Sequence, residues 1–124
     1  MELSTYFKSV LEMDHAAIVI CDLDHTILYM NPTAIHNYEK YGGKSLLGRN
    51  VLDCHNPHSI ERIKEVVEWF KSDVSHNLVY TYSNEKQNKD VYMVALRDEN
   101  QNLIGYYEKH EFRTHETMKM YDLW

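Results

Sequence analysis

Potential metal ligands are densest in the stretch Cys54-His55-Asn56-Pro57-His58. Imidazole and thiolate are ligands that zinc and iron accept in proteins, so His55 and His58, with Cys54 as a third ligand, are candidates for zinc or haem iron. These three side chains cannot close a tetrahedral site alone. The pair His58-Ser59 is also suited to the start of a helix. The metal hypothesis and the helix-start interpretation both stay open.

Two aspartates follow an apolar run in the stretch Asp22-Leu23-Asp24-His25-Thr26. This pattern resembles the nucleophile motif of haloacid-dehalogenase-like phosphatases, in which Asp22 would attack phosphorus and Asp24 would act as general acid. Such chemistry also needs a lysine and further carboxylates that hold Mg²⁺ at the strand ends of a parallel sheet. No repeated βα units follow downstream. We therefore favour a polar turn between two strands and expect no enzymatic activity.

The charge and composition of the chain argue against some classes of binding partner. The chain has 124 residues, enough for one domain, and 13 Lys and Arg against 19 Asp and Glu give a formal charge of −6. A nucleic-acid partner is disfavoured because it requires clustered cations. There is neither a signal-peptide pattern nor an apolar run long enough for a bilayer, so we expect a cytoplasmic protein without a membrane partner. Two cysteines are too few for a disulfide framework.

Hydrophobic periodicity predicts the elements that must position these groups. Apolar residues at helical spacing predict an amphipathic N-terminal helix over 2–14, and β-branched runs predict a hairpin. Asn31-Pro32 and the later pattern predict two further helices. Three strands follow in the last third of the chain. The expected strands are 16–21, 26–30, 78–82, 91–96 and 103–112, and the expected later helices are 33–38 and 57–71.

The last three strands are joined by polar links too short for crossover helices, which predicts an antiparallel arrangement. By strand parity Tyr80 and Tyr82 share one face, and Tyr92 shares a face with Val94. Both faces of these strands carry apolar side chains. This indicates that the outer face is covered by the N-terminal helix or by a second subunit.

The order of elements, with its punctuation, resembles the PAS sensor domain family. The resemblance covers roughly residues 14–114. It is carried by Ile18-Val-Ile-Cys-Asp-Leu-Asp24, Ile27-Leu-Tyr-Met-Asn-Pro-Thr-Ala34, Leu46-Leu-Gly-Arg-Asn-Val-Leu-Asp53, and Arg97-Asp-Glu-Asn100 before Leu103-Ile-Gly-Tyr106. His25 stands where the family often has glycine, so we expect the first turn to be longer or differently shaped.

The resemblance implies an α+β fold with a five-stranded antiparallel sheet, in the sequence order β-β-α-α-α-β-β-β, and an N-terminal helix. It divides the chain into a helix at 1–14, a PAS-like domain at 15–114 and a tail at 115–124. The function implied is that of a sensory domain, as in some bacterial regulatory proteins, which binds a small molecule or a signalling partner and relays a conformational change. We also expect a homodimer through the N-terminal helix or the outer sheet face.

A small cavity between helices and sheet would hold the ligand. The candidate pocket residues are Tyr38, Cys54, His55, His58, Ile63, Tyr80, Tyr92, Met93 and Tyr106. The resemblance allows haem on His55 or His58 and disfavours a light-sensing flavin, because Val51 stands where the photochemical adduct needs cysteine. A module without any ligand, whose cavity is filled by its own side chains, is the remaining alternative.

Overall fold

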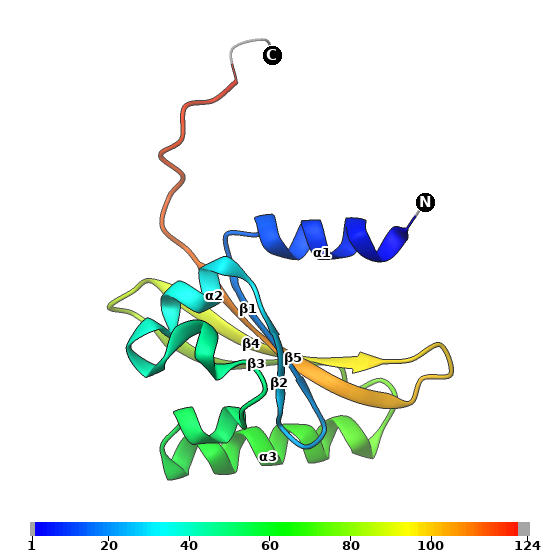
Figure 1. The fold of residues 1–124 in the computed structure, drawn as a ribbon. Helices are drawn as coiled ribbons and strands as arrows, with labels where there is room; N and C mark the ends of the chain where they lie inside the picture. Colours follow the sequence, from blue (N-terminus) through cyan, green and yellow to red (C-terminus); the bar gives the residue numbers. More distant parts are fainter. Residues whose placement is uncertain (1, 122–124) are drawn as a thin grey trace.

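A computed structural model describes residues 2–121 of the chain, and within them a five-stranded sheet is flanked by helices (Figure 1). The α-helices are α1 (Leu3–Met13), α2 (Pro32–Asn37) and α3 (Pro57–Ser72). The strands are β1 (Ala17–Asp22), β2 (Ile27–Met30), β3 (Leu78–Asn84), β4 (Lys89–Arg97) and β5 (Leu103–Phe112). The 3₁₀ turns between α2 and α3 are η1 (Glu39–Tyr41), η2 (Gly43–Leu46) and η3 (Val51–Cys54).

The sheet has the strand order β2-β1-β5-β4-β3, and every neighbouring pair is antiparallel. The predicted meander of the last three strands is thus confirmed, and so is the fold class. The first and last strands of the chain pair in the centre of the sheet, so β5 is bonded on both edges. The helix α3 runs across one face of the sheet, whereas α1 lies apart from it (Figure 1).

The core lies between α3 and the sheet. The buried side of α3 is made of Ile63, Val66, Val67 and Phe70, at the spacing of one helix face. These side chains belong to one cluster with the inward-facing residues of β1, β4 and β5. Alternation along β1 places Ala17, Val19 and Cys21 in this cluster.

The first hairpin turn is built around Asp22, whose Oδ1 accepts hydrogen bonds from the backbone N–H of Asp24 at 2.9 Å and of Thr26 at 3.0 Å. His25 follows with a left-handed φ of +66°, which glycine would adopt at lower cost. Its Nδ1 lies 2.7 Å from the hydroxyl of Tyr106, so a side-chain contact accompanies the unfavourable backbone. The two aspartates therefore belong to a turn between antiparallel strands, unlike the parallel sheet that the phosphatase chemistry needs.

A β-bulge in β3 corrects the expected parity of its tyrosines. The pairing partner of Tyr80 is Tyr92, but the partner of Tyr82 is Val91, because the register shifts between the two tyrosines. One extra residue moves all later side chains to the other face. Tyr80 and Tyr82 therefore do not share a face, contrary to the sequence-based expectation.

The start of α3 also differs from the suggestion of a cap at His58-Ser59. The N-cap is Asn56, whose Oδ1 accepts from the backbone N–H of Ser59 at 2.8 Å. Pro57 then occupies the first helical position, where its missing N–H costs nothing. His58 is consequently on the first turn of the helix with its imidazole free to contact neighbouring side chains.

The helix α1 has no buried residue, and its apolar side is exposed at Leu3, Tyr6, Phe7 and Val10. Its end is held by Asn31, whose Nδ2 donates to the carbonyl of Leu11 at 3.0 Å. Within residues 2–121, no helix has both the length and the apolar character needed to cross a bilayer.

Candidate functional site

A cavity of about 400 Å³ opens between α3 and the face formed by β3, β4 and β5. We call it the α3 cavity. It is lined by Tyr38, His55, Asn56, His58, Ser59, Arg62, Ile63, Thr81, Tyr82, Val91, Met93, Glu108 and His110. This volume lies in the range of small-molecule sites in proteins.

The floor of the cavity comes from β5. Glu108 is paired with Met93 of β4 and with Val19 of β1. His110 is paired with Val91 of β4 and with Ala17 of β1. Side chains two residues apart on a strand point to the same face, so Glu108 and His110 lie side by side beneath α3. Both are at least nine-tenths buried, with exposed fractions of 6% and 7%.

Polar atoms on this floor lack protein partners. Oε2 of Glu108 and both ring nitrogens of His110 are buried without a hydrogen bond. Most buried polar atoms in folded proteins are paired, and an unpaired one costs about 1–3 kcal/mol. Nε2 of His55 lies 3.9 Å from Oε1 of Glu108, which is too long for a hydrogen bond. The unpaired atoms therefore mark the place where a bound molecule would contribute hydrogen bonds.

Burial also shifts the pKa values of the two side chains on the floor, His110 and Glu108. It lowers the pKa of His110 to about 3, with Lys89 and His55 adding repulsion, so this imidazole is neutral at neutral pH. Burial raises the pKa of the Glu108 carboxyl, and attraction from His55 and Lys89 opposes the rise. Lys89 is itself buried at the start of β4, where desolvation lowers its pKa.

The mouth of the cavity is bridged by Arg62 from α3. Its Nη1 donates to the carbonyl of Thr81 at 3.0 Å, and its Nη2 lies 3.3 Å from Nε2 of His58. The guanidinium thereby ties α3 to β3 at the edge of the opening. Because the side chains of Arg62 and His58 are exposed, the bridge can open at little cost.

Five of the residues proposed from the sequence line the α3 cavity: Tyr38, His55, His58, Ile63 and Met93. Cys54 lies beside it, next to a small void shared with Tyr38 and core residues. Burial raises the pKa of the Cys54 thiol, which disfavours the thiolate that a metal would need.

The three other proposed residues lie elsewhere. Tyr80 and Tyr92 contact each other with ring centroids 5.3 Å apart, and the hydroxyl of Tyr80 donates to Asp90 at 2.7 Å. Tyr106 is fully buried in the core, where it meets His25. None of these three is among the residues that line the α3 cavity.

The candidate ligands of the stretch 54–58 do not converge on a common point that a metal ion could occupy. Across residues 2–121, no three His, Cys, Asp or Glu side chains converge as they would around a metal ion. Nε2 of His58 faces the Arg62 guanidinium, a cation that competes for the same lone pair. Nε2 of His55 is directed at Glu108 instead, so the stretch 54–58 does not bring its candidate ligands together.

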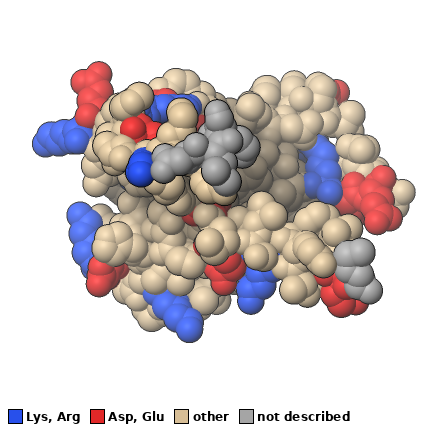
Figure 2. All heavy atoms as spheres, turned by 90° about the horizontal axis from the view of Figure 1, so that it is seen from above, with Lys and Arg blue, Asp and Glu red and all other residues tan. Residues whose placement is uncertain are grey.

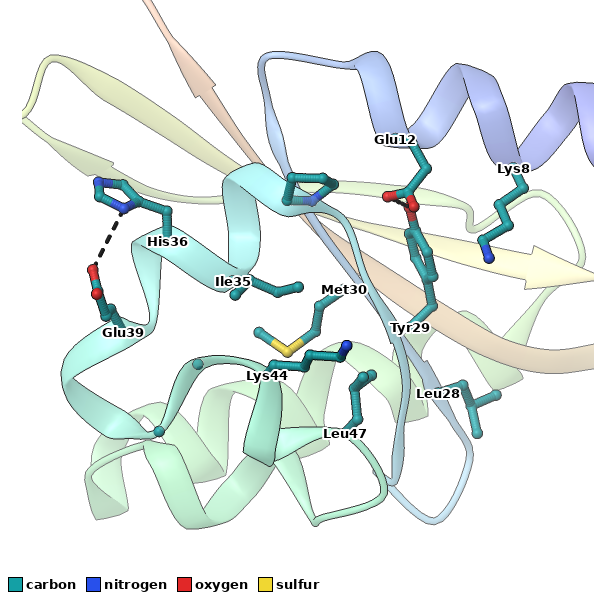
Figure 3. Close-up of a pocket in the computed structure, with 13 residues that line it drawn as sticks. Lys8, Glu12, Leu28, Tyr29, Met30, Ile35, His36, Glu39, Lys44 and Leu47 are labelled. Atoms are coloured by element: carbon teal, nitrogen blue, oxygen red, sulfur yellow. Dashed lines mark hydrogen bonds and ion pairs between the residues drawn. The ribbon is translucent and has the colours of Figure 1, made fainter.

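A second, larger groove of about 660 Å³ lies between α1, β2 and the segment from α2 to η2. Figure 3 shows Lys8 and Glu12 reaching into it from α1, with Leu28 and Leu47 at its opposite side. Two pairs of its polar groups are partnered: the hydroxyl of Tyr29 donates to Glu12 at 2.8 Å, and His36 lies 3.5 Å from Glu39, while Lys8 and Lys44 are exposed to solvent. None of the residues that line this groove has a buried polar atom without a hydrogen-bond partner, in contrast to Glu108 and His110 in the α3 cavity.

Sequence reasoning missed Glu108, His110 and Arg62. The signal for the first two was strand parity: Tyr106 was proposed as a pocket residue, and the residues two and four positions later must face the same way. The alternating charges of residues 108–111 are instead typical of a solvent face. The face seen in Figure 2 has no patch of a single charge that would indicate another binding site, because Lys and Arg are interspersed there with Asp and Glu.

The chain matches the sequence model of one domain family and resembles several solved structures. A sequence model described as PAS domain matches residues 15–108. The structure of a C-terminal domain from Streptococcus mutans is 22% identical, with a TM-score of 0.71, over 92% of this chain and 87% of that chain. A PAS domain from Colwellia psychrerythraea is 18% identical, with a TM-score of 0.66, over 91% of this chain and 98% of that one.

A sensory box sensor histidine kinase structure from Vibrio cholerae has a TM-score of 0.56 at 13% identity, over 87% of this chain and 90% of that chain. At such identities the structures share the fold alone. No curated protein matches the chain at a significant level.

Proposed function

This chain belongs to the PAS domain family, whose members are sensory and signalling domains, and we propose that it senses a small molecule bound in the α3 cavity. The observation that carries the proposal is the unmet hydrogen-bonding demand of Glu108 and His110 inside a cavity of suitable volume. A ligand that supplies these hydrogen bonds stabilises the closed arrangement of α3 on the sheet. Sensing requires that the ligand binds this arrangement more tightly than another arrangement that the empty chain adopts.

The helix α2 offers a route from the cavity to the N-terminal helix. Tyr38, which lines the cavity, is the C-cap residue of α2, and Asn31 is its N-cap. Asn31 also holds the carbonyl of Leu11 at the end of α1. A ligand that displaces Tyr38 would therefore shift a short rigid helix whose other end anchors α1. We propose that α1 is the element whose position reports occupancy.

Filling the cavity tests the proposal directly. Val91 lines the cavity on β4, and Val91→Phe is expected to weaken binding of any cavity ligand about tenfold or more, while overpacking costs about 1–3 kcal/mol of stability. The measurement is ¹⁵N-resolved NMR of the wild-type chain and the variant, titrated with small molecules extracted from the natively purified protein and with a fragment library. Binding should shift amide signals of α3, β5 and Leu11.

Val94→Phe is the matched control, because its β5 partner Tyr107 lies between the inward-facing Tyr106 and Glu108, so Val94 is on the outer face of the same strand. It should leave binding intact. If no extracted molecule or fragment shifts the cavity signals, the sensing proposal fails and the ligand-free interaction module replaces it. A visible absorption band in the purified protein would instead support the haem alternative.

We also propose that two copies of the chain associate through α1. Four of its apolar side chains, Leu3, Tyr6, Phe7 and Val10, are 57–67% exposed, and they follow the i, i+3, i+4, i+7 pattern of a packed helix face. Ile104 on β5 is also exposed. No described segment of the same chain buries this side of α1. A second copy supplies an identical apolar stripe, as symmetric dimers do.

The combined variant Phe7→Glu and Val10→Glu is expected to convert a dimer to a monomer, because it buries two unpaired charges in the proposed interface. Sedimentation velocity measures the change, with an expected rise in the dimer dissociation constant of about 100-fold or more. Ser9→Glu, a polar position on the same helix, is the control and should remain dimeric. A wild-type chain that sediments as a monomer at its highest soluble concentration would rule out this interface.

A further inference from the structure

The hydrogen-bonding groups on the floor of the α3 cavity, together with His55 beside it, are rich in acceptors. Nδ1 of His55 lies 2.9 Å from the carbonyl of Val51, and since a carbonyl only accepts, this nitrogen is the donor. His55 attracts Glu108 only when its ring is protonated; with a cationic ligand in the cavity the ring is neutral, and its Nε2 is then an acceptor facing Glu108. The ionised Glu108 carboxylate offers acceptors only, with Oε2 unpartnered. The neutral His110 ring offers one acceptor and one donor.

A ligand head group that matches this floor must bring several N–H donors. An alcohol brings one donor, and a carboxylate brings none. An ammonium group brings three donors and a positive charge. From this inventory we propose that the α3 cavity takes a small organic amine in its protonated form, with the ammonium between His55, Glu108 and His110. The inference rests on the proposed sensing function and names its ligand class.

The remaining walls suit the body of such a molecule. Ile63, Val91 and Met93 provide an apolar surface beside the floor. The rings of Tyr38 and Tyr82 also line the cavity, and aromatic faces attract cations. The formal charge of −6 raises the local concentration of cations around the chain.

Two cationic side chains of the protein, Lys89 and Arg62, lie near the proposed position of the ammonium group. Lys89 attracts Glu108, but the Glu108 Oε2 has no hydrogen-bond partner, so the lysine does not occupy the site of the proposed ammonium. Arg62 stands at the mouth and is engaged with Thr81 and His58. The ammonium therefore belongs at the floor, and the apolar end of the molecule belongs toward α3.

A set of three probes with one body separates the head-group classes. Phenethylamine, 2-phenylethanol and 3-phenylpropionate share a phenyl ring on a two-carbon chain and differ in the polar group. We expect phenethylamine to bind about 10-fold or more tightly than the other two, as charge-assisted hydrogen bonds to a buried carboxylate predict. Isothermal titration calorimetry gives the affinities, and amide shifts of residues 108–110 locate the probe.

The variant Glu108→Gln keeps the shape of the side chain and removes its charge. It is expected to reduce phenethylamine affinity about 10- to 100-fold and to leave 2-phenylethanol nearly unchanged. Glu111→Gln is the matched control, because it removes the same charge from β5 at a residue paired with Lys109 at 2.8 Å and Arg113 at 3.1 Å. Circular dichroism of both variants confirms that each is folded.

The pH dependence supplies an independent readout. Burial raises the pKa of Glu108, which must ionise to pair with the ammonium, so phenethylamine affinity should rise with pH through the Glu108 titration. The groups that act on this carboxyl are His55 from the link before α3 and Lys89 from β4. Its charge in turn acts on Tyr38, Cys21, Cys54 and Tyr106. His110 stays neutral above a pH of about 3. Affinity for 2-phenylethanol should not follow this profile.

The outcomes separate the two proposals. Tighter binding of phenethylamine, lost in Glu108→Gln and kept in Glu111→Gln, supports the amine assignment. Preferential binding of the alcohol or the carboxylate in the same cavity overturns the amine assignment and leaves the sensing function standing. If none of the three probes moves a cavity signal while extracted molecules or fragments do, the amine class is again wrong. If nothing binds, the sensing function fails with it.

Discussion

Replacing Asn31 by alanine is expected to lower the free energy of unfolding by about 3–5 kcal/mol, a large share of the stability of a small domain. The Asn31 side chain is fully buried. Its Oδ1 accepts from the backbone N–H of Ile18 at 3.0 Å and of Ala34 at 2.9 Å. Its Nδ2 donates to the carbonyls of Ala16 at 2.8 Å and Leu11 at 3.0 Å. Alanine removes this partner from the buried backbone groups of Ile18, Ala34 and Ala16, whereas the carbonyl of Leu11 keeps the N–H of Asp14 at 3.4 Å.

Asn56→Ala is the matched control for this prediction. Asn56 is also an N-cap followed by proline, but it is exposed, and its Oδ1 accepts only from Ser59. The expected loss is about 1 kcal/mol, the usual contribution of an N-cap. Urea unfolding followed by circular dichroism gives both values. Equal losses in the two variants would mean that the contacts of Asn31 with β1 and α1 contribute nothing beyond the cap.

The strands and helices followed from the sequence because their hydrophobic periods are strong and their links are short. Asn31-Pro32 marked the start of α2, and the short polar links fixed an antiparallel arrangement of β3, β4 and β5. Asn56 was overlooked as the N-cap of α3 although it stands before a proline in the same way as Asn31. The two Asn-Pro pairs have one physical explanation, a carboxamide cap with proline at the first helical position.

The candidate site was predictable only in part. His55, His58 and Ile63 were proposed from one contiguous stretch before and within α3. Tyr82 was assigned by a parity that a bulge in β3 breaks, and no residue type in that strand announces the bulge. Glu108 and His110 were missed because a charged residue inside a strand is normally solvent-exposed. Their burial depends on the central place of β5, which is a property of the whole sheet.

Replacing Arg97 by alanine is expected to destabilise the fold by about 2–4 kcal/mol, through loss of charge-assisted hydrogen bonds at the end of α3. Nη2 of Arg97 donates to the carbonyls of Phe70 at 2.7 Å and Asp73 at 3.1 Å. Its Nε donates to Asn77 at 2.7 Å, and its Nη1 donates to Gln101 at 3.1 Å. The last carbonyls of a helix have no donor within it, so the guanidinium of Arg97 supplies the missing N–H donors and ties α3 to the hairpin of β4 and β5.

Two further variants identify the cause of the expected Arg97 effect. Arg97→Lys keeps the positive charge near the helix end but has no planar fork, so it should recover less than half of the loss. Arg62→Ala removes the other arginine that ties α3 to the sheet, at an exposed position, and should cost less than about 1 kcal/mol. Thermal and urea unfolding give the stabilities. Full recovery by lysine would assign the effect to charge alone, whereas a loss that needs the fork makes Arg97 the geometric anchor of the helix that roofs the α3 cavity.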